Sequence, residues 1–411
     1  MFALVASPVA MTADTLALLS SGTAEIVPEG GLAEKLRLAR ALRVKLGLDP
    51  TAPSVTLGWA VVLRKLRRFQ DLGHTAVLIV GDFTARVGDP SGRSETRQRL
   101  SKKAVDAFAE RVLEQFMLVL SKERLEIRRN SEWLEPLDME GILDLTSVTT
   151  VARMLERDDF AMRYAEQRPI SLMEFLYPLL QGYDSVAVEA DVELGGSDQL
   201  FNLLMGRDMQ RAWGQDPQVC LTVPLIEGLD GVQKMSQSLG NYVGVTDPPD
   251  EMFGKLMSIP DGLIAKYELL CTELGSEDHA RVEAGLADGS IHPNEEKRRM
   301  ARAVVDLYHR EGAGEAAEQR FNVVHRDREL PETIADAPIP PDVVADGMVY
   351  LPALLVSLGR AGSKSEARRL VEQGGVRIDG ESVTDPDFEK DRAFYLGKVL
   401  QVGKRWFGRL S

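Results

Sequence analysis

The hydrophobic pattern near the start of the chain predicts a strand, a helix and a second strand. The apolar residues at 44–48 predict the first strand, and a turn with Asp49 and Pro50 follows. Apolar residues then recur at roughly helical spacing from Leu57 to Leu72, and Gly73 supplies a stop. The continuous apolar run at 76–80 predicts a strand covered on both faces. This order is typical of a nucleotide-binding unit in a parallel α/β sheet, with its ligand at the helix N-terminus.

The rest of the chain is predicted to be mainly helical, with a small module at its end. Residues 100–165 and 246–330 are rich in Glu, Arg and Leu, which favours helices. Pro331 and the Ala/Pro-rich segment 335–341 indicate a linker, and a compact module follows from about residue 346.

Composition limits the class of protein. A chain of 411 residues predicts two or three domains. It contains no apolar run of about 18 residues, so no membrane span is expected, and residues 1–11 lack the basic leader of a signal peptide. Cys220 and Cys271 are too few for a disulfide framework or a zinc site, which favours a reducing cytoplasm. The net charge is −14, but residues 351–411 hold 11 Lys/Arg against 8 Asp/Glu, so a local RNA-binding face is expected there.

Six segments together resemble one known family in order and spacing. They are 45–51 (Lys-Leu-Gly-Leu-Asp-Pro-Thr), 88–92 (Gly-Asp-Pro-Ser-Gly), 130–133 (Asn-Ser-Glu-Trp), 177–184 (Tyr-Pro-Leu-Leu-Gln-Gly-Tyr-Asp), 195–199 (Gly-Gly-Ser-Asp-Gln) and 234–238 (Lys-Met-Ser-Gln-Ser). From about residue 12 to 411 the chain resembles a bacterial tyrosyl-tRNA synthetase, a class I enzyme, of the type with a C-terminal S4 domain. The resemblance implies an α/β fold made of a Rossmann-like parallel-sheet catalytic domain with a helical connective insertion (1–230), an α-helical anticodon-binding domain (231–333), a linker (334–345) and a small α+β S4 domain (346–411).

The resemblance also implies a tyrosine pocket. Asp184 is expected to accept the phenolic hydroxyl, and Tyr177 and Gln181 to face the ammonium group beside Asp89. A phenylalanine ligand would leave Asp184 buried without a partner, so this contact is expected to select tyrosine strongly over phenylalanine. Gln199 is expected to face the carboxylate and the adenylate. The expected tyrosine-binding residues are Lys45, Asp89, Tyr177, Gln181, Asp184 and Gln199.

The phosphate side departs from the family pattern. Class I synthetases carry His-x-Gly-His at the start of the first helix, whereas residues 56–59 here are Thr-Leu-Gly-Trp. The second signature, Lys-Met-Ser-Lys-Ser in the family, has Gln237 in place of its second lysine. The expected catalytic residues are Thr51, Thr56, Trp59, Lys234 and Gln237, and the expected ATP-binding residues are Gly47, Asp49, Gly58, Gly196, Asp198 (at the ribose), Lys234, Met235 and Ser236.

These three departures predict slow amino-acid activation. A preorganised transition-state donor is typically worth about 3 kcal/mol, so three uncompensated losses correspond to a slowdown on the order of 10⁴–10⁶. Trp59 could stack on a base, but filling the phosphate cavity is the favoured interpretation. His74 is interpreted as a helix-end residue, and Arg86 and Arg93 fit the family pattern without replacing the histidines.

The C-terminal module resembles an S4 RNA-binding domain. Ser363 and Glu366 have capping-box spacing, and Lys364 and Arg368 share a helix face. Residues 376–380 predict a strand that enters a turn. A basic helix face beside a β-turn suits contact with an RNA backbone, and the expected RNA-binding residues are Lys364, Arg368, Arg369 and Arg377.

Two hypotheses of function follow. The first is a cytoplasmic tyrosine–tRNA ligase that uses L-tyrosine, ATP with Mg²⁺ and tRNA(Tyr), without a tightly bound cofactor or structural metal. The second is an impaired paralogue that binds tyrosine, an analogue or tRNA and serves regulation, specialised metabolism or inhibitor resistance. The resemblance implies a homodimer in either case.

Overall fold

The computed structural model of the chain describes residues 12–91, 100–325, 334–403 and 406–411. The chain divides into two compact units, residues 1–315 and 316–411, and each is described by itself. The predicted division at residue 230 stays a prediction. The interpretations of residues 1–11, Gly92 and Arg93 lie outside the described residues.

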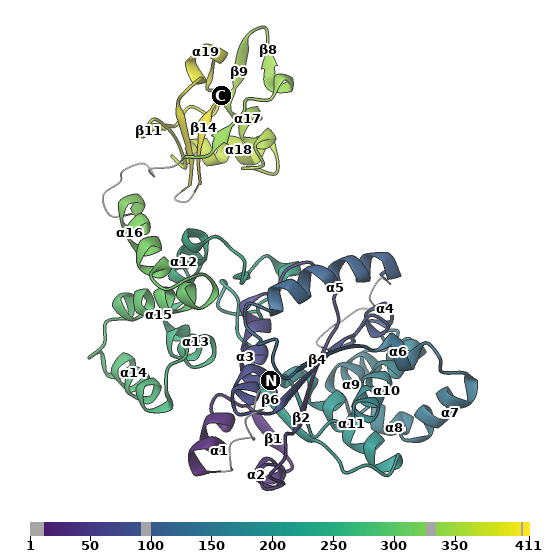
Figure 1. Cartoon of the computed structure of the whole chain (residues 1–411). Helices are drawn as coiled ribbons and strands as arrows, with labels where there is room; N and C mark the ends of the chain where they lie inside the picture. Colours follow the sequence, from purple (N-terminus) through teal and green to yellow (C-terminus); the bar gives the residue numbers. More distant parts are fainter. Residues whose placement is uncertain (1–11, 92–99, 326–333, 404–405) are drawn as a thin grey trace, which may run out of the picture. The chain divides into compact units, whose positions relative to one another are not determined.

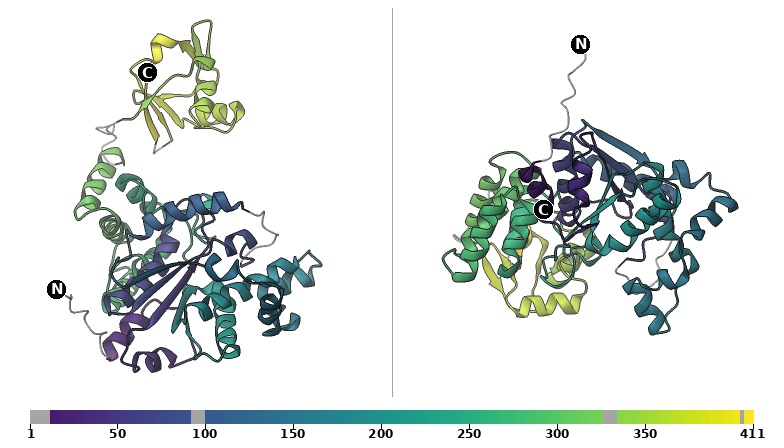
Figure 2. Two further views of the ribbon diagram at one scale, coloured as in Figure 1. Left: turned by 45° about the vertical axis from the view of Figure 1, so that its right-hand side comes forward. Right: turned by 90° about the horizontal axis from the view of Figure 1, so that it is seen from below.

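The first unit is built on a six-stranded sheet of order β1-β6-β5-β2-β3-β4 (Figure 1). All neighbouring pairs are parallel except β1 with β6, and helices cover both faces (Figures 1 and 2). The strands are β1 (Glu25–Val27), β2 (Arg43–Leu48), β3 (Thr75–Val80), β4 (Leu125–Arg129), β5 (Val192–Gly196) and β6 (Val219–Val223). This is the α/β catalytic fold that the sequence predicted.

The predicted strand–helix–strand unit is confirmed as β2, α3 (Leu57–Asp71) and β3. The apolar residues of α3, among them Leu57, Leu63 and Leu66, are buried. β2 lies between β3 and β5, so the chain leaves β2 towards one side of the sheet and leaves β5 towards the other. Such a switch point opens a crevice at the carboxyl ends of the strands, where ligands bind in α/β folds.

The prediction of a mainly helical stretch at 100–165 missed one strand. β4 pairs in parallel with β3, from Ala76 opposite Leu125 to Val80 opposite Arg129. β4 is the last strand of the sheet and none of its residues is fully buried, so its charged residues are tolerated and hide the strand pattern. The helices there are α5 (Lys102–Phe116), α6 (Ser131–Leu134), α7 (Met139–Ser147), α8 (Val151–Met154) and α9 (Asp158–Ala165).

Further helices complete the first unit. A capping box of Ser171 and Glu174 starts α10 (Leu172–Ala187), which packs along α11 (Leu200–Ala212). The predicted helical character of 246–330 is confirmed for the described residues up to 325. The remaining helices are α1 (Ala13–Ser20), α2 (Gly31–Leu36), α4 (Thr84–Val87), α12 (Pro249–Met257), α13 (Ile264–Cys271), α14 (Ser276–Asp288), α15 (Pro293–Tyr308) and α16 (Ala313–His325), which spans the boundary between the units.

The second unit is a small α+β module with its own core. Its main sheet has the order β11-β10-β13-β14-β7. Ser363 accepts a hydrogen bond from the Glu366 amide at the start of α18, but the Glu366 carboxylate accepts from Gly362 and not from Ser363. The elements are β7 (Asp336–Ala337), β8 (Val344–Ala345), β9 (Met348–Tyr350), α17 (Leu351–Ser357), α18 (Lys364–Glu372), β10 (Val376–Ile378), β11 (Glu381–Val383), β12 (Glu389–Asp391), α19 (Arg392–Tyr395), β13 (Val399–Val402) and β14 (Trp406–Leu410).

The segment 334–345 is not simply the linker that its prolines indicated. β7 pairs in parallel with β14, and Ala337 and Ile339 are buried in the core of the second unit. The prolines at 338, 340 and 341 follow that short edge strand, a position where a missing N–H is tolerated.

None of the helices in the described part of the chain is both long enough and apolar enough to cross a membrane.

Candidate functional site

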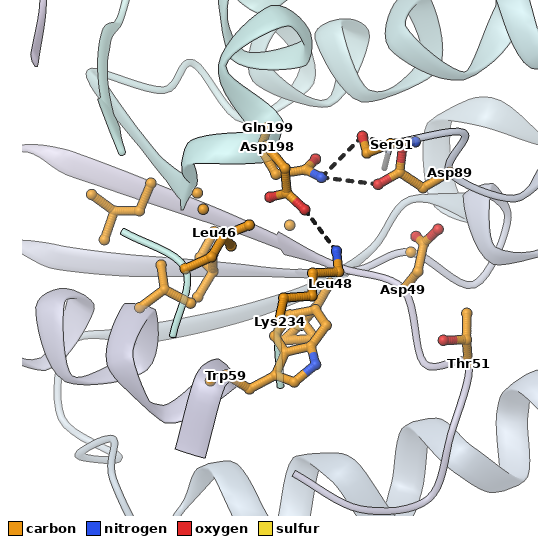
Figure 3. A pocket seen from close by; sticks show the side chains of 18 of the residues that line it. Leu46, Leu48, Asp49, Thr51, Trp59, Asp89, Ser91, Asp198, Gln199 and Lys234 are labelled. Atoms are coloured by element: carbon orange, nitrogen blue, oxygen red, sulfur yellow. Dashed lines mark hydrogen bonds and ion pairs between the residues drawn. The ribbon is translucent and has the colours of Figure 1, made fainter. Parts of the chain in front are cut away.

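A cavity of about 360 Å³ opens at the carboxyl ends of the central strands and the start of α3 (Figure 3). It lies at the switch point between β2 and β5. A Cβ at Gly47 would meet no protein atom within 4 Å, so this position leaves room for a ligand. Of the site residues predicted in the first unit, all except Lys45 line the cavity: Gly47, Asp49, Thr51, Thr56, Gly58, Trp59, Asp89, Tyr177, Gln181, Asp184, Gly196, Asp198, Gln199, Lys234, Met235, Ser236 and Gln237.

Asp184 supplies a buried carboxylate on α10 and is only 3% exposed. It accepts hydrogen bonds from Trp133 Nε1 at 2.8 Å and from Asn130 Nδ2 at 3.3 Å. Burial raises the pKa of Asp184 to about 7, against the opposing charge of Lys45 and these two hydrogen bonds. Both oxygens are therefore positioned before a ligand arrives. The supporting roles of Trp133 and Asn130 were not predicted, although the segment 130–133 was singled out in the sequence.

Lys45 lies behind the cavity lining. Its Nζ is 2.9 Å from Glu193 Oε1, and it donates to the Gln181 carbonyl at 2.9 Å and to Ser185 Oγ at 2.7 Å. Both charged side chains are fully buried. The predicted contact of Lys45 with tyrosine stays a prediction, since its visible contacts join β2 to β5 and α10.

Removing one member of this pair is expected to destabilise the first unit strongly. Lys45→Ala leaves the Glu193 carboxylate buried without its partner, which typically lowers the free energy of unfolding by about 3–5 kcal/mol. Urea unfolding followed by circular dichroism measures the loss. The double variant Lys45→Met/Glu193→Gln removes both charges and is expected to recover part of it. Equal stability of Lys45→Ala and the native chain would show that the Lys45–Glu193 ion pair does not stabilise the first unit.

Tyr177 and Asp49 form the next part of the cavity. Tyr177 donates its hydroxyl to Asp49 Oδ2 at 3.0 Å, and Thr84 donates to Asp49 Oδ1 at 2.7 Å. Burial and the nearby carboxylates, Asp49 first, raise the pKa of Tyr177 well above its ordinary value, so its hydroxyl stays a donor. Asp49 was predicted on the ATP side, and its contact with Tyr177 places it where the predicted tyrosine and nucleotide sides meet.

A network of side-chain amides connects the remaining residues that were predicted to bind tyrosine. Gln199 Nε2 donates to Asp89 Oδ2 at 2.9 Å, while Asn202 Nδ2 donates to Gln181 Oε1 at 3.0 Å and to Gln199 Oε1 at 3.1 Å. Arg157 lies 3.5 Å from Asp89 and is 6% exposed. Sequence reasoning missed Arg157 because nothing distinguishes it from the other arginines of 100–165.

The residues predicted to form the phosphate side all line the cavity: Thr56, Trp59, Lys234 and Gln237. Figure 3 shows Trp59 and Lys234. Thr56 is 2% exposed and caps α3 without a side-chain hydrogen bond to the helix. Trp59 is half-buried in the first turn of α3. Lys234 donates to Asp198 Oδ2 at 2.9 Å, and Gln237 donates to the Ser54 carbonyl. The three predicted departures from the family pattern thus gather in one part of the cavity.

His74 is structural, as interpreted from the sequence. It is 2% exposed after the far end of α3, and its Nδ1 accepts from the Leu42 amide at 3.2 Å. Burial lowers its pKa to about 4. It is not a substitute for the missing histidines.

Comparisons with known proteins agree with this geometry. The model of the family described as tRNA synthetases class I (W and Y) matches residues 37–326, and the S4 domain model matches residues 351–389. The tyrosine–tRNA ligase of Moorella thermoacetica is 53% identical over 96% of this chain and 95% of its own length. The tyrosine–tRNA ligase of Geobacter sulfurreducens is 48% identical over 97% of this chain and 99% of its own length.

The chain belongs to the class I tRNA synthetases of the W and Y type.

Solved structures show the same fold for this synthetase. The Archaeoglobus fulgidus tyrosyl-tRNA synthetase, solved with L-tyrosine, has a TM-score of 0.60 at 22% identity and covers 74% of this chain and 98% of its own. The C-terminally truncated mitochondrial tyrosyl-tRNA synthetase of Aspergillus nidulans has a TM-score of 0.62 at 20% identity. The match covers 75% of this chain and 92% of that one.

The S4 domain of the synthetase carries the four residues predicted to bind RNA. Lys364, Arg369 and Arg377 are exposed on α18 and β10. The Arg368 guanidinium instead donates to both oxygens of Asp387 and to the Tyr350 hydroxyl, the last at 3.0 Å. The shared face of Lys364 and Arg368 is therefore less basic than helical spacing implied, because Asp387 neutralises one of its charges.

Proposed function

We propose that this synthetase is a tyrosine–tRNA ligase that activates L-tyrosine with ATP–Mg²⁺ and transfers it to tRNA(Tyr). The observation that carries the proposal is the buried Asp184 carboxylate, oriented by Trp133 and Asn130 inside the cavity. A phenol donates a further hydrogen bond to this carboxylate, whereas a phenyl ring covers the carboxylate without offering a donor. The name shared by relatives about 50% identical over nearly the whole chain supports the same function.

We assign a role to the residues that would face each part of the substrate. Asp184 binds the phenol, while Tyr177 and Gln181, beside Asp89, face the ammonium group. Gln199 faces the carboxylate and the adenylate. Asp198 binds the ribose, which replaces Lys234 as the partner of this carboxylate. Gly58 and Gly47 leave room for the nucleotide. The support for this arrangement is that these side chains line one cavity.

The S4 domain is proposed to bind tRNA(Tyr) through Lys364, Arg369 and Arg377, with Arg368 positioned by Asp387. Exposed cations beside a β-turn suit a phosphate backbone. We propose a cytoplasmic location for this chain, since Cys220 and Cys271 are both free, as is usual in a reducing compartment.

We also propose that two copies associate through α7, α8, α9 and the start of α10. These helices expose large apolar side chains, which in a folded protein often mark an interface. They are Met139, Leu143, Val151, Met162, Tyr164 and Leu172, each between 46% and 81% exposed.

Charged substitutions on this face are expected to separate the copies. Leu143→Asp/Leu172→Asp places two carboxylates at the interface, where burying them is unfavourable. Light scattering after size exclusion should give one chain mass of 45.3 kDa for the variant and twice that for the native chain. Leu38→Asp, at a residue 49% exposed after α2, is the matched control and should stay a dimer. A native chain that elutes as a monomer would disprove the proposed association.

Tyrosine binding is expected to weaken in acid. Asp184 has a pKa of about 7, and its charged form is the better acceptor for the phenol, so affinity should fall about tenfold between pH 8 and pH 6. The same raised pKa favours the protonated folded state, so its contribution to stability is present below pH 3.8 and is lost as pH rises through 7. Calorimetry of tyrosine binding between pH 6 and pH 8 measures the change in affinity. Asp184→Asn should bind with no such slope, and a flat native profile would exclude Asp184 as the acceptor.

Charging of tRNA(Tyr) with radiolabelled tyrosine tests the proposed function itself. Acid-stable tyrosyl-tRNA should form with ATP and tyrosine, and phenylalanine should not be attached. The Asp184→Asn chain controls for contaminating synthetase and should lose most of the charging. Charging with phenylalanine in preference to tyrosine would refute the proposal.

A further inference from the structure

Arg157 is a buried arginine that lies immediately before α9. Its side chain is 6% exposed, and it is not one of the described residues that line the cavity. The Cζ atom lies 5.3 Å from the centroid of the Phe160 ring and 5.9 Å from that of Phe201. A guanidinium keeps its charge in a protein, so its burial is costly unless its N–H groups have partners.

Each nitrogen of Arg157 has a partner on a different part of the chain. Nε lies 2.7 Å from Asp159 Oδ1 in the first turn of α9. Nη1 donates to Asn202 Oδ1 on α11 at 3.0 Å, and Nη2 donates to Ser91 Oγ, which follows α4. A planar guanidinium can hold three partners in one plane, whereas the single nitrogen of a lysine cannot span them in the same way.

These contacts determine which way the Asn202 amide faces. Arginine donates hydrogen bonds and accepts none, so Asn202 has to turn its Oδ1 towards Arg157 and its Nδ2 away from it. The Nδ2 group then donates to Gln181 Oε1 at 3.0 Å and to Gln199 Oε1 at 3.1 Å. Asn202 is 1% exposed and buried with the arginine, so the orientation of both glutamine amides follows from a contact behind the cavity wall.

Arg157 holds the Asp89 carboxylate through Ser91. Ser91 Oγ accepts from Arg157 and from Gln199 Nε2, the latter at 3.2 Å, and its own proton goes to Asp89 Oδ1 at 2.6 Å. Gln199 Nε2 also donates to Asp89 Oδ2 at 2.9 Å (Figure 3). Arg157 Nη2 itself lies 3.5 Å from Asp89 Oδ1, and the Asp89 side chain stays 21% exposed.

The direction of these hydrogen bonds suits a ligand with an ammonium group. An ammonium only donates, so it needs oxygen acceptors around it. Gln181 and Asp89 line the cavity, and each keeps an oxygen lone pair after the contacts above. A reversed Gln181 amide would instead present its own N–H groups to the ammonium.

We propose that Arg157 is a positioning residue for the ammonium group of tyrosine: through Asn202 and Ser91 it fixes the orientation in which Gln181 and Asp89 offer acceptors to that group. The inference rests on the proposed function and assigns a task in substrate recognition to a residue outside the cavity lining. An arginine that merely joined α9 to α11 would support every ligand of the cavity alike.

Calorimetry with three phenols separates these roles. Tyrosine and tyramine carry the ammonium group, while 3-(4-hydroxyphenyl)propionate keeps the phenol and the carboxylate but lacks the ammonium. Arg157→Met should weaken binding of tyrosine and tyramine by about 10–100-fold, the range expected for lost hydrogen bonds to a charged group. Binding of 3-(4-hydroxyphenyl)propionate should change by less than about threefold. Arg157→Lys still donates and should recover part of the loss for both amines.

Arg153→Met is the matched control. Arg153 lies on α8, pairs with Glu156, and has its Cζ 5.8 Å from the centroid of the same Phe201 ring, but its side chain is 44% exposed. Its removal should leave all three affinities at their native values. If Arg157→Met does not fold, Arg157→Met/Asp159→Asn takes its place, because it leaves no unpaired carboxylate at Asp159, and the same losses are expected.

The pattern across ligands decides the inference. Equal weakening of all three ligands in Arg157→Met, or native affinity for tyrosine and tyramine, would overturn it. If 3-(4-hydroxyphenyl)propionate binds the native chain too weakly to measure, the loss for tyramine in Arg157→Met and its partial recovery in Arg157→Lys decide instead. A native chain that binds no tyrosine would overturn the proposed function.

Discussion

Thr56→His/Trp59→His/Gln237→Lys is expected to raise tyrosine-dependent ATP–pyrophosphate exchange by about 10⁴-fold or more. Each substitution places a cationic or polar donor in the cavity, where we propose that the leaving pyrophosphate gains charge. A preorganised donor of this kind typically lowers the activation free energy by about 3 kcal/mol, so three of them should lower it by about 6–9 kcal/mol. All three positions line the cavity with Lys234, so the new side chains lie within one site.

Matched variants distinguish charge from simple repacking. Thr56→Asn/Trp59→Phe/Gln237→Met changes the same positions without adding a cation and should leave exchange near the native rate. The single variants should each raise exchange less than the triple variant, because the donors act on one leaving group. If the triple variant exchanges no faster than the native chain while binding tyrosine normally, these residues do not govern phosphate stabilisation.

Asp184→Asn is expected to weaken tyrosine binding by about 100-fold and to remove most of the preference for tyrosine over phenylalanine. The amide is a weaker acceptor than a carboxylate, and hydrogen bonds to charged groups are worth about 1.5–3 kcal/mol. The new amide also meets two donors, Trp133 Nε1 and Asn130 Nδ2, so the local bonds compete with the ligand. Calorimetry with tyrosine and phenylalanine measures both affinities.

Trp133→Phe is the control for this second prediction. It removes the 2.8 Å hydrogen bond to Asp184 but keeps the carboxylate, so tyrosine binding should weaken by less than it does in Asp184→Asn. Native tyrosine affinity and native selectivity in Asp184→Asn would show that the phenol binds elsewhere.

Local patterns predicted the central fold because they depend on short stretches of chain. The strand β2, the helix α3 and the strand β3 follow directly from apolar spacing and a glycine stop. β4 was missed because a half-exposed edge strand tolerates the charged residues that also favour helices. The two short edge strands within 334–345, β7 and β8, were missed because prolines mark linkers and strand edges alike.

The candidate site followed from motifs, whereas its supporting contacts come from residues distant in sequence. Asp184 was identified, but its contacts with Trp133 and Asn130 cross 51 and 54 positions of the chain. Arg368 looked like a free cation on a helix face, yet Asp387, 19 residues away, pairs with it. Such pairings depend on tertiary structure, which spacing along one helix does not report.

We infer that the chain makes tyrosyl-tRNA and that its altered phosphate side slows the activation step. A rapid-quench time course with excess chain, labelled tyrosine, ATP–Mg²⁺ and tRNA(Tyr) follows the adenylate and the tyrosyl-tRNA together. We predict that tyrosyl-tRNA appears at the rate of adenylate formation and that adenylate does not accumulate. Rapid accumulation of adenylate ahead of tyrosyl-tRNA, or the complete absence of tyrosyl-tRNA, would contradict the claim.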